Sequence, residues 1–254
     1  MNRKKTALAR YDFATHRLFV PGVYAADAAL PLTREAMNYL INVLRMSEGA
    51  RVLVFDGIHG EWQGVLRQPT RKTAVIVLEH QTRPQTAKGR IGYAFAPLKA
   101  ARLDYMVQKA VEMGVCRLTP VITQRTQVSR LKADRLEANA IEACEQCGVI
   151  SLPEVCEEVK LASFITALAP ETLLVFADED AEIASPIRAL QHAKAEAKVE
   201  VLVGPEGGFT PEERALIARH PNVCRLSLGP RILRADTAAV TALALVQATL
   251  GDLA

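Results

Sequence analysis

Two glycine-containing loops are the segments best suited to bind a ligand. The first, Gly204-Pro205-Glu206-Gly207-Gly208, follows the apolar run Val201-Leu202-Val203. Its glycines lack a Cβ, so the backbone can approach a bound molecule closely. The order of residues differs from the Gly-Lys-Ser/Thr of a P-loop and from the G-x-G-x-x-G of a dinucleotide fingerprint, which argues against a phosphate cradle. An ordinary tight turn from strand to helix is the alternative.

The second loop, Gly229-Pro230-Arg231-Ile232-Leu233-Arg234-Ala235-Asp236, follows the strand-like run from Val223 to Leu228. Like the first loop, it leads into a predicted helix. Two loops that follow strands and enter helices can converge at the carboxyl edge of one parallel sheet, where α/β proteins bind ligands. The sequence therefore predicts one ligand site formed by both loops.

The helices that follow these loops have clear sequence signals. Thr210 is the predicted N-cap, Pro211 suits the first helical position and Glu213 completes a capping box. The last predicted helix, from Thr237 to about Leu250, is apolar around almost its whole circumference. Such a helix is buried, either within one subunit or against a second subunit.

The first part of the chain reads as a small β-barrel. Short β-type runs at 18–20, 52–55, 61–66 and 73–78 are separated by turn residues. One helix is predicted among them, with Thr33 as N-cap and an apolar face formed by Met37, Leu40, Ile41 and Leu44. The polar stretch Gln81–Gly89 is typical of a linker, so we predict domains at residues 1–80 and 81–254.

Beyond residue 89, predicted strands alternate with predicted helices. The strands are expected at 91–96, 118–122, 173–177 and 201–203, and the helices at about 101–113 and 132–147 and from Ser185-Pro186. This alternation predicts an α/β domain with a parallel sheet and helices on its faces.

Composition narrows the class of protein. The chain has 254 residues, half of them hydrophobic, and its formal net charge is +3. Its five cysteines are an odd number in apolar or helical surroundings, unlike a secreted disulfide framework. Cys144 and Cys147 form a C-x-x-C, but they lack a second ligand pair, so core packing is favoured over metal binding. The absence of a signal peptide or a membrane-spanning run predicts a cytoplasmic protein.

The two loops carry a resemblance to a known family. Leu202-Val203-Gly204-Pro205-Glu206-Gly207-Gly208, followed by Leu226-Ser227-Leu228-Gly229-Pro230-Arg231-Ile232-Leu233-Arg234, resembles the bacterial ribosomal small-subunit RNA methyltransferase E family. Further matches include His16-Arg17-Leu18-Phe19-Val20, Val43-Leu44-Arg45-Met46 and Glu142-Ala143-Cys144-Glu145-Gln146-Cys147, so the similarity spans nearly the whole chain.

The resemblance implies a fold and an activity. The expected fold is an N-terminal PUA-like β-barrel plus a C-terminal SPOUT α/β domain with a trefoil knot, and the expected active form is a homodimer. The expected reaction is S-adenosylmethionine-dependent methylation of N3 of a uridine in 16S ribosomal RNA, recognised within the assembled small subunit, without a metal. The implied cofactor-binding residues are Leu202, Val203, Gly204, Pro205, Glu206, Gly207, Gly208, Leu228, Gly229, Pro230, Ile232 and Leu233.

This reaction assigns roles to three residues of the second loop. Removal of the uridine N3 proton spreads negative charge onto O2 and O4, which an arginine would stabilise, while a carboxylate or water takes the proton. Arg234, Arg231 and Asp236 are the candidate catalytic residues. Phosphate positioning is the alternative role for both arginines. We expect Glu206 to hold its own loop by accepting backbone N–H bonds.

Basic residues outside the loops are candidates for RNA contacts. They lie in a group at the N-terminus, near Lys72 and between residues 125 and 135, and they can neutralise phosphates or form a merely solvated face. The predicted RNA-binding residues are Arg17, Arg45, Lys72, Arg125 and Arg130.

Two other functions fit parts of the pattern. A SPOUT ribose 2′-O-methyltransferase acting on tRNA or rRNA would share the glycine loop. It usually has a Ser-Leu-Asn type of segment where this chain has Arg231–Thr237. A non-catalytic RNA-binding protein would use the barrel and the basic groups alone, and it would not bind S-adenosylmethionine.

Overall fold

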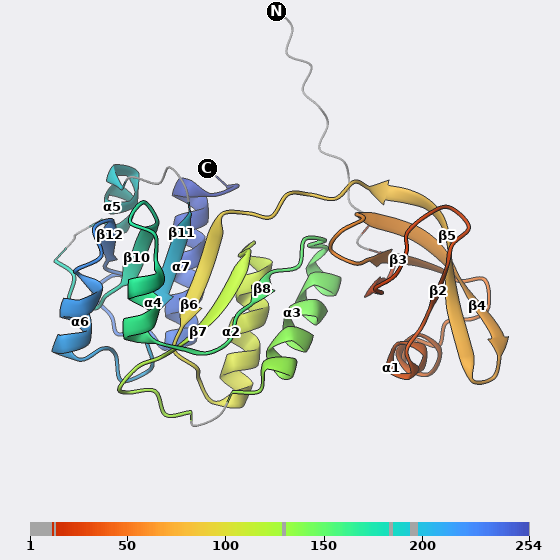
Figure 1. The fold of residues 1–254 in the computed structure, drawn as a ribbon, viewed down its shortest axis with the longest axis horizontal. Coiled ribbons are helices and arrows are strands. Elements are labelled where there is room, and N and C mark those ends of the chain that lie inside the picture. Colours follow the sequence, from red (N-terminus) through yellow and green to blue (C-terminus); the bar gives the residue numbers. More distant parts are fainter. Residues whose placement is uncertain (1–11, 13, 129–130, 183–184, 194–197, 254) are drawn as a thin grey trace, which may run out of the picture. The chain divides into compact units, whose positions relative to one another are not determined.

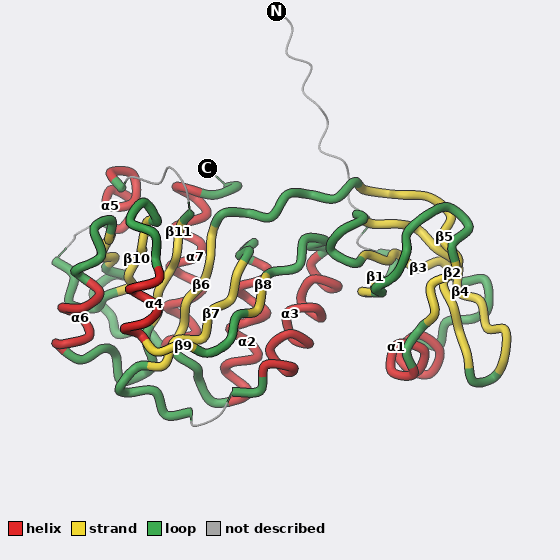
Figure 2. Tube along the Cα trace, viewed as in Figure 1, coloured by secondary structure: helices red, strands yellow, loops and turns green. Residues whose placement is uncertain are grey.

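The computed structural model describes residues 12, 14–128, 131–182, 185–193 and 198–253. The chain divides into two compact units. Unit 1 contains the chain up to Thr86 together with Glu145–Ser151, and unit 2 contains Ala87–Cys144 and the chain from Leu152 onward. Each unit contains its own sheet, and Figures 1 and 2 together label their strands.

Unit 1 contains a five-stranded sheet in the order β1-β3-β4-β5-β2. β1 pairs in parallel with β3, and the other three pairings are antiparallel. Among the described residues, β1 and β2 are the two edges and no ladder joins them, so the sheet is open where a closed barrel was predicted. The strands are β1 (Arg17–Phe19), β2 (Ala29–Pro31), β3 (Arg51–Phe55), β4 (Glu61–Thr70) and β5 (Thr73–Arg83).

Two features of this sheet were not predicted. β2 has only three residues, too few for an alternating pattern, and it ends in Pro31, a residue confined to edges or strand ends. β5 continues to Arg83, so the first three residues of the predicted linker are strand. Their backbone groups pair with β4 as far as Glu61, and this pairing offsets the polar character of the stretch.

The predicted helix of unit 1 is present but changes its winding. The Thr33 side chain accepts a hydrogen bond from the Ala36 backbone N–H, and α1 (Arg34–Asn38) begins there. The chain then continues as the π-helical segment η1 (Tyr39–Val43). Leu40 is fully buried in the core that also contains Val52, Val54 and Ile76. The apolar face predicted from the spacing is therefore confirmed.

A buried ion cluster joins β1, β4 and β5. The Glu61 carboxylate lies 2.5 Å from Arg17 Nε and 2.7 Å from Arg83 Nη2, and Thr82 Oγ1 donates to it at 2.8 Å. Burial opposes ionisation of Glu61, but the hydrogen bonds from Arg83, Arg17 and Thr82 outweigh it, so the pKa of Glu61 is lowered. The arginines also donate to the carbonyls of Glu145 and Gly148. Glu61 thus connects the sheet to the second segment of unit 1.

Glu61→Gln is expected to destabilise unit 1 by about 3–5 kcal/mol at neutral pH, because it removes the negative charge that compensates the buried guanidinium group of Arg17. The pKa of Glu61 is lower in the folded than in the unfolded protein, so ionised Glu61 stabilises the fold at a pH above its unfolded pKa of about 4.3. This stabilisation is lost as the pH falls through the folded pKa. The difference between wild type and variant should therefore shrink below about pH 4. Fluorescence of Trp62, the single tryptophan of the chain, follows unfolding of this unit. A difference that is independent of pH would contradict the assignment.

Unit 2 contains a sheet in which all pairings are parallel, as predicted. Its order is β12-β10-β11-β6-β7-β8, and β9 also pairs with β7. The strands are β6 (Ile91–Phe95), β7 (Arg117–Ile122), β8 (Glu154–Val155), β9 (Val159–Lys160), β10 (Leu173–Ala177), β11 (Val199–Val203) and β12 (Val223–Leu226). The last strand ends two residues before the predicted Leu228.

Helices pack on this sheet, as Figures 1 and 2 show. α7 contacts α2, α5 and β11, while α4 contacts α6, β7 and β9. Phe164 of α4 and Ile217 of α6 share a core with Phe176 and Leu202 of the sheet. The helices are α2 (Ala100–Glu112), α3 (Ala133–Cys147), α4 (Leu161–Ala167), α5 (Pro186–His192), α6 (Pro211–Ile217) and α7 (Ala235–Leu250).

The apolar last helix is buried within its own unit along one side. Ala239, Ala242, Leu243 and Val246 are buried, and the helix packs against α2 and α5. Its start is two residues earlier than predicted, with Arg234 as N-cap. Of the two alternatives predicted for this helix, burial within one subunit is observed along this side.

Candidate active site

Three strand ends meet at one edge of the unit 2 sheet. β10 lies between β11 and β12 and pairs with both. The glycine loop after β11 and the second loop after β12 therefore flank the end of β10, where Asp178 and Glu179 follow. Because the three strands are parallel, their carboxyl ends lie on the same side, as predicted for a ligand site of an α/β protein.

A cavity of about 300 Å³ lies between these loops, a size in the range of small-molecule sites. Most of its lining is apolar or backbone, with carboxylates and one arginine at its surface. The lining residues are Ala177, Asp178 and Glu179 at the end of β10 and after it, Val203–Phe209 at the end of β11 and after it, and Leu226, Leu228, Gly229, Arg231, Ile232, Leu233, Ala235 and Ala238 at the end of β12 and after it.

Most of the predicted loop residues line this cavity, but two do not. Leu202 is fully buried in β11 and belongs to the core of the sheet, and Pro230 is exposed in the second loop. The sequence reasoning missed Asp178, Glu179 and Phe209. Asp178 and Glu179 directly follow the strand predicted at 173–177, just as the two loops follow strands. This position could have indicated that they belong to the site.

The glycine loop has two positions that favour glycine. Gly208 has φ +66, in the left-handed region, and a Cβ there would lie 2.5 Å from Glu179 Oε1. A Cβ on Gly204 would lie 2.6 Å from the ring of Phe209, which is buried against Phe176. The backbone thus passes close to its neighbours without side chains in the way.

The capping box predicted at the start of α6 is present and has an additional partner. Thr210 Oγ1 accepts from the Glu213 N–H at 3.2 Å, and Glu213 Oε2 accepts from the Thr210 N–H at 3.0 Å. The other carboxylate oxygen of Glu213 accepts from the Gln124 N–H at 2.7 Å. This buried carboxylate therefore connects the glycine loop to the loop after β7.

Arg125, predicted as an RNA contact, lies against the glycine loop. Its Nη1 donates to the Gly207 carbonyl at 2.5 Å, and its Cδ would lie 3.3 Å from a Cβ on Gly207. Glu206 was predicted to accept backbone N–H bonds of its own loop. Instead its Oε1 accepts from Arg102 Nη1 of α2 at 3.1 Å. Both contacts join segments that are distant in sequence.

An acidic segment forms another side of the cavity. Asp178 is buried and pairs with Arg214 and with Arg225, whose Nε lies 2.7 Å from Oδ2. Burial lowers the pKa of Arg214, and the charges of Arg225 and Arg125 add to this effect. Glu179 accepts from Arg214 Nη2 at 2.5 Å while half of its side chain remains exposed. The cavity therefore combines apolar walls with carboxylates that are each paired with an arginine.

The three candidate catalytic residues lie on and just after the second loop. Arg231 lines the cavity and is exposed. Arg234 is the exposed N-cap of α7, directly before the lining residue Ala235. Asp236 is half-buried in the first turn of α7, and its Oδ1 accepts from the Thr237 N–H at 3.0 Å. Burial, with the charge of Asp236 as a further cause, raises the pKa of Tyr93 on β6.

The other predicted RNA contacts differ in accessibility. Arg45 and Lys72 are exposed in unit 1. Arg17 is 6 % exposed and bonded to Glu61, so it holds the sheet together. It is therefore not available for the phosphate contact that was predicted. Arg130 and the basic residues before Asp12 lie outside the described residues.

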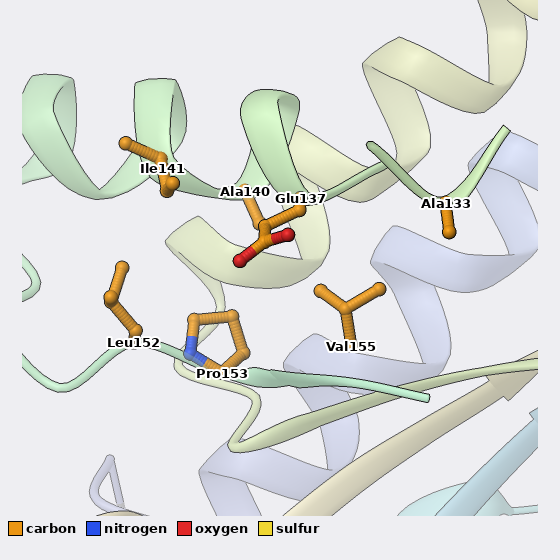
Figure 3. Close-up of a pocket in the computed structure, with 7 residues that line it drawn as sticks. All are labelled: Ala133, Glu137, Ala140, Ile141, Leu152, Pro153 and Val155. Carbon is orange, nitrogen blue, oxygen red and sulfur yellow. The ribbon is translucent and has the colours of Figure 1, made fainter. Parts of the chain in front are cut away.

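A second, smaller cavity of about 150 Å³ lies between α3 and Leu152–Val155 (Figure 3). Glu137 is its one ionisable lining residue. Cys144 and Cys147 lie on the same helix, the first buried and the second half-buried. Over the described part of the chain, no group of three or more His, Cys, Asp and Glu residues is arranged to hold a metal.

Comparison with known proteins identifies the family. A model of the RNA methyltransferase domain matches residues 85–247, and a model of the RNA methyltransferase PUA domain matches residues 32–79. A ribosomal RNA small subunit methyltransferase E from Synechocystis sp. is 31 % identical over 240 residues, which are 92 % of this chain and 78 % of the relative. The chain belongs to the ribosomal RNA small subunit methyltransferase E family.

Solved structures agree with membership of the methyltransferase E family. A putative methyltransferase from Legionella pneumophila with bound S-adenosylmethionine has a TM-score of 0.81 and 32 % identity, over 92 % of this chain and 97 % of that one. A ribosomal RNA small subunit methyltransferase E from Neisseria gonorrhoeae, bound to S-adenosylmethionine, has a TM-score of 0.79 and 26 % identity, over 94 % and 100 %. Within the described residues, no helix is both long and apolar enough to cross a bilayer.

Proposed function

We propose that this enzyme methylates N3 of a uridine in 16S ribosomal RNA, with S-adenosylmethionine as the methyl donor. The observation that carries the proposal is the cavity between the two loops in a member of the methyltransferase E family. We assign RNA binding to an N-terminal domain, residues 1–80, and methyl transfer to a C-terminal domain, residues 81–254. We place the enzyme in the cytoplasm, because its RNA substrate is found there.

The cavity fits the chemistry of S-adenosylmethionine. Leu228, Leu233 and Phe209 offer apolar surface to an adenine ring, and the glycine loop offers backbone groups that can approach closely. Glu179 and Glu206, each paired with an arginine, bring carboxylate oxygens to the cavity, and these oxygens can attract the positively charged sulfonium. When bound, the cofactor supplies an electrophilic methyl group.

The protein residues act on the uridine. N3 becomes a nucleophile once its proton leaves, and Asp236 or a water takes that proton. Arg234 and Arg231 stabilise the negative charge that spreads onto O2 and O4. The remaining requirement is to hold N3 in line with the methyl group, which positioning alone can provide.

We also infer that the enzyme is a homodimer with a trefoil knot in its C-terminal domain, as in its family. Ile232 supports the dimer, because this apolar side chain at the cavity is 96 % exposed in the single chain.

Ile232→Asp is expected to shift the protein toward the monomer, because a charge would replace an apolar contact in the interface. Sedimentation velocity at several protein concentrations measures the change. Ile58→Asp, at an exposed isoleucine of unit 1, is the matched control. Identical sedimentation of the Ile232 variant and the wild type would remove this residue from the interface.

Arg45→Ala combined with Lys72→Ala should weaken binding of 16S ribosomal RNA and reduce the slope of log affinity against log salt by about two, one for each lost phosphate contact. Affinity for S-adenosylmethionine should not change. The matched control is Arg188→Ala with Lys160→Ala, two exposed cations of unit 2. An unaltered salt slope would mean that Arg45 and Lys72 are only solvated.

The reaction is tested by mapping the methyl group. Purified enzyme, S-adenosylmethionine and unmodified small ribosomal subunits are incubated, and the RNA is digested and analysed by mass spectrometry. We expect one new 3-methyluridine in 16S ribosomal RNA, with assembled subunits as a better substrate than free RNA. A methyl group on ribose, on transfer RNA only, or nowhere would overturn the proposal.

A further inference from the structure

The aromatic side chains of Tyr24, His59 and Trp62 form a cluster in unit 1. The rings of Tyr24 and His59 are stacked with centroids 5.5 Å apart and planes at 7°. Trp62 contacts Tyr24 edge-on at 6.3 Å. Tyr24 is buried, and its hydroxyl donates to the Val20 carbonyl at 2.8 Å. The buried tyrosine thus supports one face of the histidine ring.

The position of His59 is fixed by further contacts. Its Nδ1 lies 2.6 Å from Asp56 Oδ2, and the same aspartate accepts the His59 backbone N–H at 2.8 Å. The His59 carbonyl accepts from Trp62 Nε1 at 3.0 Å and from Gln81 Nε2 at 2.9 Å. Backbone and ring are therefore held in one orientation, so little side-chain entropy is left to lose on binding.

The imidazole of His59 is partly open to solvent, and its stacking partner Tyr24 covers only one of its two faces. The His59 side chain is 44 % exposed although Tyr24 covers one face of its ring. Its sequence neighbour Ile58 is 71 % exposed, and Val23, next to Tyr24, is 79 % exposed. A fixed aromatic plane with apolar neighbours in solvent is the kind of surface on which nucleobases stack.

We propose that the face of the His59 ring opposite Tyr24 is a stacking platform for an unpaired base of the RNA substrate. The proposal rests on the proposed function, which makes RNA the partner, and His59 and Trp62 lie in the segment that matches the RNA methyltransferase PUA domain. A base fits better than a phosphate, because the Asp56 carboxylate beside the ring repels anions. His59 would contact the base itself, whereas Arg45 and Lys72 are proposed to contact the phosphates of the RNA backbone.

Trp62 provides a direct readout, because it is the single tryptophan of the chain and its indole N–H bonds to His59. Its fluorescence is recorded during titration with a short single-stranded oligouridylate and with an abasic ribose-phosphate strand of the same length. We expect the oligouridylate to change the emission and to bind more tightly than the abasic strand. Equal affinity of both strands with unchanged emission would overturn the proposal.

Variants separate stacking from polar contact. His59→Ala should weaken binding of the oligouridylate about tenfold, as expected for the loss of one stacked base, whereas His59→Phe keeps the ring and should retain most of the affinity. His80→Ala, at an exposed histidine of β5, is the matched control and should bind like the wild type. Circular dichroism melts confirm that each variant is folded. A His59→Phe variant as weak as His59→Ala, or a His59→Ala variant with unchanged affinity, would overturn stacking.

This experiment does not depend on methyl transfer. If the wild type binds the oligouridylate through His59 but produces no 3-methyluridine, the proposed reaction is wrong and the stacking proposal is supported. If methylation occurs normally in His59→Ala and its RNA affinity is unchanged, the proposed reaction is supported and the stacking proposal is wrong. Loss of activity on subunits with unchanged oligouridylate binding would indicate a ribosomal protein as the partner of this surface, and the platform would be overturned.

Discussion

Arg234→Ala is expected to lower kcat for methyl transfer by about 10²–10³-fold while affinity for S-adenosylmethionine changes little. The reason is that charge develops on the uridine oxygens only during the reaction, so a group that stabilises it acts mainly in the transition state. Arg234 is exposed at the start of α7, directly before a residue that lines the cavity. Single-turnover rates and isothermal titration with the cofactor measure the two effects separately.

Arg219→Ala is the matched control for this prediction, because Arg219 is an exposed arginine of unit 2 that does not line the cavity. Its kcat should equal that of the wild type. If Arg234→Ala instead raises KM for RNA and leaves kcat unchanged, Arg234 positions a phosphate, and the charge on the uridine is stabilised by another group.

Gly208→Val is expected to abolish binding of S-adenosylmethionine. The side chain would be forced into the left-handed backbone region, and its Cβ would lie 2.5 Å from the half-exposed Glu179 carboxylate, so either the loop or the Glu179 side chain, which both line the cavity, must move. Either movement changes the shape of the site. Isothermal titration with S-adenosylmethionine measures the loss, and a cooperative thermal melt shows that the protein is still folded.

Gly49→Val controls for backbone strain alone. Gly49 has φ +84, and a Cβ added there would meet no neighbouring atom within 4 Å, so both substitutions carry a similar strain of about 1–2 kcal/mol. Only Gly208→Val should lose the cofactor. Normal affinity in Gly208→Val would remove the glycine loop from the cofactor site, whatever its effect on the melting temperature.

Local features of the fold were predictable from the sequence because they depend on neighbouring residues. The capping box of Thr210 and Glu213 and the apolar face of the first helix follow from spacing within a few positions. The alternation of strands and helices predicted the parallel sheet, and the position of two loops between a strand and a helix predicted that they meet at its carboxyl edge. Short or irregular elements such as β2 and η1 gave no such signal.

The pairing of buried charged residues could not be predicted from the sequence. Arg17 looks like a surface cation in the sequence, yet it is buried because Glu61, 44 positions away, compensates its charge. Glu200 lies in an apolar strand and is buried with Arg117 as its partner, and the missing side chain of Gly92 gives its carboxylate space. Neither pairing can be read from local pattern, since each depends on which strands become neighbours.

The sequence alone determined the family, the parallel sheet and the two loops, because motif order, periodicity and glycine positions are properties of contiguous residues. Only the tertiary structure decided that Asp178 and Glu179 share the cavity, that Arg125 holds the glycine loop and that His59 is stacked on Tyr24. Those contacts join segments far apart in the chain. Their free energy depends on burial and on the distance between charges, and both are set only when the strands have assembled.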